Sequence, residues 1–137
     1  MNEYDDRIVA YLNERLDEEE GVALRAAFGW GAEWTVNRQN DDSAVLAATG
    51  TPRAAWSEDI DVITHAAAWN PARALLSIET RRVILKLYAG AQFALDCHAD
   101  DAGEQGHVEG IRKVVRILLQ EYVGRPDYPQ PEGTQHA

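Results

Sequence analysis

The segment DCHADDAGEQGH, from Asp96 to His107, contains the residue types that bind metal ions. Its thiol belongs to the only cysteine of the chain, and two imidazoles and several carboxylates lie within a few residues of it. Zinc takes four ligands from thiolate, imidazole and carboxylate groups. The candidate zinc ligands are therefore Cys97, His98 and His107, completed by Asp100, Asp101 or Glu104. Their spacing matches none of the paired-ligand signatures of known zinc sites.

The same segment also has the composition of a polar loop between two helices. Aspartate and glycine favour turns, and Glu104 is placed to lie near the N-terminus of a following helix, where a negative charge is stabilising. In this interpretation Asp100 or Asp101 serves the turn, and no cofactor is expected. Zinc is the only cofactor that the residue pattern offers as an alternative.

Common catalytic motifs are missing from the sequence. It contains no glycine-rich phosphate loop, no Gly-x-Ser-x-Gly, no His-Glu-x-x-His and no paired cysteines. An enzyme needs a nucleophile or base with an orienting partner, or an open metal position. The sequence therefore predicts a protein that is not an enzyme.

Length and composition indicate one domain of ordinary size. A chain of 137 residues with 45% hydrophobic content can build a single core, which we place in residues 1–123. Residues 124–137 contain three prolines and are expected to form an extended tail. No apolar run is long enough for a membrane span, the N-terminus is acidic rather than signal-like, and one cysteine allows no internal disulfide. We therefore expect no membrane association and a cytoplasmic location, which is the host cytoplasm if a phage encodes the chain.

The charge of the chain is strongly acidic and unevenly distributed. Because the formal net charge is −10, we expect no binding to the phosphates of nucleic acids. Residues 1–21 hold eight acidic residues against two arginines, a net of −6, whereas residues 71–95 have a net of +3. These two regions can attract each other within the fold or between two copies in a homo-oligomer. The likewise acidic first helix is a candidate surface for a protein partner, and the candidate interaction residues are Glu18, Glu19, Glu20, His65 and Arg73.

The pattern of apolar and turn-forming residues predicts an α+β fold, mostly helical, with about four helices packed against one small β-hairpin. Ile8, Leu12 and Leu16 repeat at helical spacing, so the first helix is expected from Asp5 or Asp6, as the cap, to Phe28. A hairpin is predicted from Glu33–Arg38 paired with Ala44–Thr49. The second helix is predicted over Thr51–Trp69 and the third over Pro71–Phe93. The apolar stripe of the fourth helix runs over Ile111–Tyr122. In the last helix Arg112, Lys113 and Arg116 are expected to turn away from the apolar stripe.

Two stretches, HAAAWNPARALLSIETRRVIL and the RPDY near the end, resemble a family of small uncharacterised actinobacterial and actinobacteriophage proteins. Members of that family carry a histidine-rich turn ending in Asp-Pro-Ala-Arg and a C-terminal His-Pro-Asp-Tyr. The matching positions are His65, Pro71, Ala72, Arg73 and Arg82, followed by Pro126, Asp127 and Tyr128. The chain departs from the pattern at Trp69, where the family has histidine, at Asn70, where it has aspartate, and at Arg125.

This resemblance implies a domain of unknown function with a phage or mobile-element background, and no mechanism. Relatives carry several cysteines between their last two helices at spacings that look like zinc ligation, and Cys97 falls in that interval. We therefore expect a small acidic, non-enzymatic protein-interaction protein. The alternatives are a small zinc-binding domain with a structural metal in the 96–107 loop, and a virion or assembly component.

Overall fold

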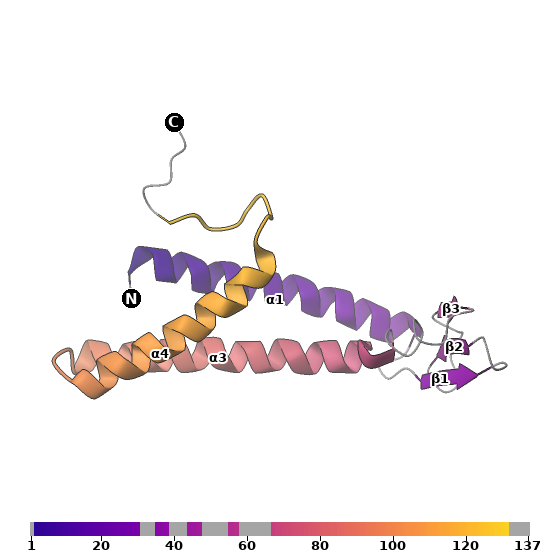
Figure 1. Cartoon of the computed structure of the whole chain (residues 1–137), viewed down its shortest axis with the longest axis horizontal. Helices are drawn as coiled ribbons and strands as arrows, with labels where there is room; N and C mark the ends of the chain where they lie inside the picture. The colour runs from indigo at the N-terminus through magenta and orange to yellow at the C-terminus, as the bar shows by residue number, and fades with distance from the viewer. Residues whose placement is uncertain (1, 31–34, 39–43, 48–54, 58–66, 132–137) are drawn as a thin grey trace. The chain divides into compact units, whose positions relative to one another are not determined.

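The computed structural model describes residues 2–30, 35–38, 44–47, 55–57 and 67–131. Its α-helices are α1 (Glu3–Trp30), α3 (Pro71–Cys97) and α4 (Ala102–Leu119), and a 3-10 turn, η1 (Gln120–Tyr122), follows α4. In chain order, α1 is followed by the short strands β1 (Thr35–Arg38), β2 (Ala44–Ala47) and β3 (Ala55–Ser57), and then by α3 (Figure 1).

The predicted fold of about four helices with one hairpin is wrong. The described residues contain three α-helices, and the predicted helix Thr51–Trp69 is interrupted because its residues Ala55–Ser57 form strand β3. β1 pairs antiparallel with β2, with Thr35 opposite Ala47, and β2 pairs antiparallel with β3. The strands thus form a three-stranded sheet instead of a two-stranded hairpin, while helices make up most of the described chain.

α1 begins earlier than predicted because its cap is Asn2. The Asn2 side-chain oxygen accepts a hydrogen bond of 2.8 Å from the backbone N–H of Asp5, three residues later, as a helix cap does. The prediction that Asp5 or Asp6 caps this helix is therefore wrong. Asp5 lies inside the first turn, and its side chain is available for another role.

α3 begins where the sequence predicted. Asn70 accepts a hydrogen bond of 2.9 Å from the backbone N–H of Arg73, and Pro71 occupies the first helical position, where a missing N–H costs nothing. The helix ends at Cys97, four residues beyond the predicted Phe93.

The contacts divide the chain into two compact units, one made of residues 1–16 and 80–137 and the other of residues 17–79. The predicted single domain over residues 1–123, with a tail over 124–137, stays a prediction. Both functional clusters described below lie in the first unit. None of the described helices is long and apolar enough to cross a membrane.

The core of the first unit is formed where α1, α3 and α4 meet. Side chains at helical spacing contribute from each helix, which confirms the predicted apolar faces of α1 and α4. Its buried apolar residues are Ile8, Tyr11, Leu12, Leu16, Leu85, Tyr88, Ala91, Val108, Val115, Leu119 and Tyr122. In the second unit, Ala23 and Ile78 are buried.

Neighbouring residues at the end of α4 test this assignment of the core. Leu119 is 3% exposed and Ile117 is 65% exposed. Leu119→Ala should lower the free energy of unfolding by about 2–5 kcal/mol, since it leaves a cavity. Ile117→Ala should change it by less than about 0.5 kcal/mol, as surface substitutions do. Urea unfolding followed by circular dichroism measures both, and equal losses would contradict the assigned packing.

Candidate functional site

The segment from Asp96 to His107 is mostly helical. α3 continues to Cys97, α4 begins at Ala102, and only residues 98–101 turn between them, as Figure 1 shows. The Asp101 carboxylate accepts hydrogen bonds from the backbone N–H groups of Gly103 at 2.7 Å and Glu104 at 3.1 Å. These bonds satisfy two amides at the start of α4, so Asp101 caps this helix. The predicted loop from Asp96 to His107 is wrong in its extent, because both of its ends are helical.

The candidate zinc ligands are distributed over three backbone environments. Cys97 is exposed at the last residue of α3, His98 is in the turn with its Nδ1 atom 3.3 Å from the Ala94 carbonyl oxygen, and His107 is exposed within α4. In the described parts of the chain, no three His, Cys, Asp or Glu side chains are grouped so that they could hold a metal ion. Zinc binding stays a prediction.

The candidate interaction residues lie in the second unit. Glu18 is exposed, whereas Glu19 and Glu20 are partly buried on the second half of α1. The Arg73 guanidinium carbon lies 5.8 Å from the centre of the Trp69 ring, a distance typical of a cation–π contact. His65, the remaining candidate interaction residue, lies outside the described residues.

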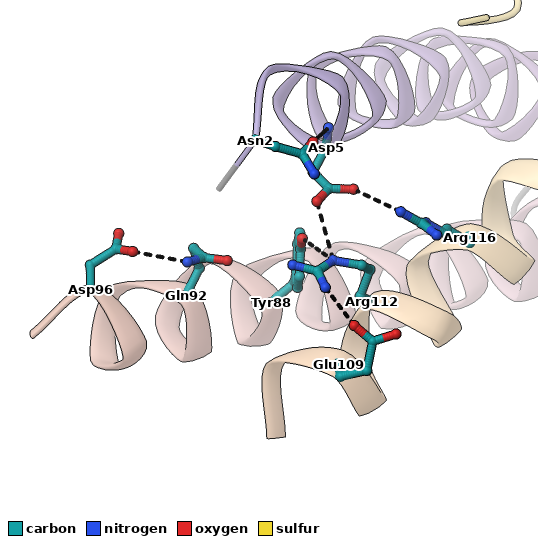
Figure 2. A network of polar contacts seen from close by, with 8 residues as sticks. All are labelled: Asn2, Asp5, Tyr88, Gln92, Asp96, Glu109, Arg112 and Arg116. Carbon is teal, nitrogen blue, oxygen red and sulfur yellow. Dashed lines mark hydrogen bonds and ion pairs between the residues drawn. The ribbon is translucent and has the colours of Figure 1, made fainter. Parts of the chain in front are cut away.

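A buried carboxylate that the sequence reasoning missed joins the three helices of the first unit. Asp5, on α1, is 2% exposed, and its Oδ2 atom accepts a hydrogen bond of 3.1 Å from Nε of Arg112 on α4. Its Oδ1 atom lies 3.5 Å from Nη2 of Arg116, one turn further along α4. Figure 2 shows both arginines pointing from α4 toward the start of α1. The prediction that Arg112 turns away from the core is therefore wrong.

Tyr88 brings α3 into the same cluster. Nε of Arg112 also donates to the Tyr88 hydroxyl at 3.4 Å, and Nη1 of Arg112 pairs with Glu109 (Figure 2). Burial raises the pKa of Tyr88 above its ordinary 10.0, and the hydrogen bond with Tyr88 raises the pKa of Arg112. At neutral pH the phenol therefore keeps its proton and the guanidinium its charge. Next along α3, Gln92 donates to Asp96 at 2.9 Å.

A second missed cluster holds the C-terminal segment against α1. Arg15 is 4% exposed, and its Nη1 atom lies 3.0 Å from the carboxylate of Asp127 in the tail. The Tyr11 hydroxyl donates to the same carboxylate at 3.2 Å, and the Arg15 guanidinium carbon lies 5.2 Å from the Tyr11 ring centre. Burial, followed by the charge of Asp127, raises the pKa of Tyr11. The tail is thus bound through a charge that is buried on α1.

Aromatic contacts complete the attachment of the tail. The Tyr11 ring meets the rings of Tyr122 and Tyr128 edge to face, with centroids 5.9 Å and 6.4 Å apart. Gly124 makes the turn out of η1 with a φ of +92°, a conformation that favours glycine. Asp127 and Tyr128 belong to the RPDY stretch, so the structure gives this motif a structural role in docking the tail.

The cluster of Asp5 and Arg112 left a signal in the sequence. Asp5 precedes Ile8 by three residues and Leu12 by seven, which places it on the buried side of α1. Arg112 lies four residues after Val108 and three before Val115, so it borders the buried side of α4. A charged residue in phase with an apolar stripe on each of two helices predicts a buried ion pair.

The role of Asp5 can be tested against its neighbour. Asp5→Asn should lower the free energy of unfolding by about 3 kcal/mol, because the partly buried Arg112 loses its buried counter-charge and keeps only the half-exposed Glu109. Asp6→Asn is the matched control, since Asp6 is exposed in the same helical turn, and should cost less than about 0.5 kcal/mol. Chemical denaturation measures both variants. A loss for Asp5→Asn as small as that of the control would show that the buried pair contributes no stability.

The attachment of the tail can be tested in the same way. Asp127→Asn should cost about 1 kcal/mol and speed amide exchange at Tyr128, because the tail loses its bond to the buried Arg15. The control is Glu14→Gln, which removes the other carboxylate that lies 3.0 Å from Arg15. Because Glu14 is 68% exposed, this change should leave the amides of the tail protected from exchange. Hydrogen exchange resolved by residue reads out the tail directly. Equal exchange at Tyr128 in both variants would contradict the proposed anchor.

Comparison with known proteins gives one result. A family model described as "Family of unknown function (DUF6221)" matches residues 5–131, a range that includes Asp5, Arg112 and the docked tail segment. No curated protein and no solved structure matches the chain. This match confirms the expectation that the chain belongs to an uncharacterised family. The chain belongs to the DUF6221 family, a family of unknown function.

Proposed function

We propose that this chain is a small non-enzymatic interaction domain that binds a basic partner protein through the second half of α1. The observation that carries the proposal is Phe28, whose side chain is 97% exposed near the end of that helix. Leu24, one turn earlier on the same side of the helix, is 52% exposed. Large apolar side chains gathered on one segment are typical of protein-binding surfaces.

Charge beside these apolar residues gives the partner its chemistry. Asp17, Leu24 and Phe28 are spaced by seven and four residues, so they follow one stripe along the helix. Glu20 precedes Leu24 by one turn on the same side as Asp17, and Glu18 and Glu19 lie further round the helix. An apolar centre with an acidic rim fits a partner that has an apolar patch bordered by lysine or arginine.

The missing catalytic motifs support a binding role over an enzymatic one. The phage or mobile-element background implied by the resemblance is part of the same proposal, as is a cytoplasmic location. The partner would then be a host or phage protein with a basic, partly apolar surface.

The test is a comparison of two charge-reversed baits. The triple variant Glu18→Lys, Glu19→Lys and Glu20→Lys should lower recovery of a captured partner by about tenfold, equivalent to about 1.4 kcal/mol. The control reverses Glu3, Asp6 and Asp100, exposed acids of the first unit, and changes the net charge equally. It should retain the partner. Quantitative mass spectrometry of the captured proteins reads out both.

A second bait separates apolar contact from charge. Phe28→Ser should lower recovery of the same partner, while circular dichroism of each variant shows that the helices are intact. Equal recovery by all baits, or equal loss with both triple variants, would contradict docking at the second half of α1.

A further inference from the structure

α3 has an apolar face on each of two opposite sides. Ile78 and Leu85 are 2% and 3% exposed, whereas Leu76, Val83 and Leu87 are 65%, 48% and 58% exposed. Each residue of an α-helix turns by about 100°, so positions two residues apart lie on opposite sides of α3. The exposed residues therefore form a stripe directly behind the buried one.

The exposed stripe has the spacing of a coiled-coil seam. Leu76, Thr80, Val83, Leu87 and Gly90 alternate in steps of four and three residues along one continuous helix. Heptad spacing of this kind matches the face of a second helix lying alongside.

Glu79 and Lys86 border this stripe on the same edge. They are seven residues apart, both are exposed, and neither forms an ion pair within the part of the chain that the structure describes. In coiled coils the residues at this edge select the partner helix and its direction.

We infer that the exposed stripe of α3 binds α3 of a second copy of this chain in an antiparallel pair. With Leu76 opposite Leu87 of the second copy, Thr80 lies opposite Val83 and the two seams match from Leu76 to Leu87. In this register Glu79 lies opposite Lys86 of the second copy. The twofold axis repeats that ion pair, so one contact produces two.

Charge selects the antiparallel direction over the parallel one. In a parallel pair, each edge residue faces the residue five positions further along the partner helix, on its other edge. Glu79 would then meet Ile84 and Lys86 would meet Ala91, so neither charge would gain a partner. The opposite signs of Glu79 and Lys86, one heptad apart, make the stripe complementary to itself. This pairing is independent of the partner surface proposed on α1.

Sedimentation equilibrium of the whole chain over a range of concentrations tests the pairing. The stripe is short, so we expect a monomer–dimer equilibrium with a dissociation constant on the order of 10 μM. Val83→Glu should abolish the dimer, because it puts two charges into the seam. Ile117→Glu, at an exposed apolar position on α4, is the matched control and should leave the equilibrium unchanged. A wild-type chain that stays monomeric at every concentration would overturn the inference.

Charge exchange tests the register. Glu79→Lys alone and Lys86→Glu alone should each weaken the dimer by about fivefold to tenfold, because like charges then face each other twice. The double variant Glu79→Lys with Lys86→Glu should restore wild-type affinity, which a role in monomer stability would not produce. Single variants that weaken the dimer without rescue in the double variant would overturn the antiparallel register, as would single variants that have no effect.

Discussion

The arrangement of the first unit depends on the burial of one carboxylate. Asp5 is 2% exposed, and removing a charge from water is costly unless an opposite charge replaces the solvent. Arg112 meets that need at 3.1 Å and touches Tyr88 at the same time. A rotation of α1 or α4 about its own axis would separate the pair and leave the carboxylate buried alone. Three helices therefore share one register, and the apolar contacts around the cluster form within it.

The attachment of the tail also depends on a buried charge that needs a counter-ion. Arg15 is buried on α1, and its charge needs a counter-ion that the neighbouring apolar residues cannot provide. Asp127 provides it from the C-terminal segment, 112 residues away in sequence, together with the exposed Glu14. The tail thus completes the first unit instead of merely extending from it. The family match, which runs to residue 131, includes this segment.

Local signals predicted local structure well. Asn70 before Pro71 acts on an amide three residues later, so the sequence alone contains all the information that this cap needs. Asp101 caps α4 in the same local way, although the apolar stripe from Ile111 indicated a later start for that helix. Asp5 was misassigned because an aspartate near a helix start looks the same whether it caps the helix or pairs with a distant residue. The difference is Arg112, which lies 107 positions away.

The predicted helix Thr51–Trp69 was wrong for a related reason. Trp56, Ile60 and Ile63 repeat at helical spacing, but Ala55–Ser57 pairs with β2, and such pairing depends on residues 9 to 13 positions earlier. Periodicity over a short apolar stretch does not separate the two outcomes. The core stripes of α1 and α4 were predicted because they are longer and continuous.

α3 shows what a two-sided apolar pattern means physically. In the sequence its apolar residues are spread around the helix, a pattern typical of a helix that is covered all round. The structure buries one side, with Ile78, Leu85 and Tyr88, and exposes Leu76, Val83 and Leu87 on the other. A monomer of this size has too few helices to cover both sides of α3 in the described part of the chain. The second stripe keeps the regular spacing of a buried one, with opposite charges along its edge, and a purely solvated helix face has no physical need for either feature.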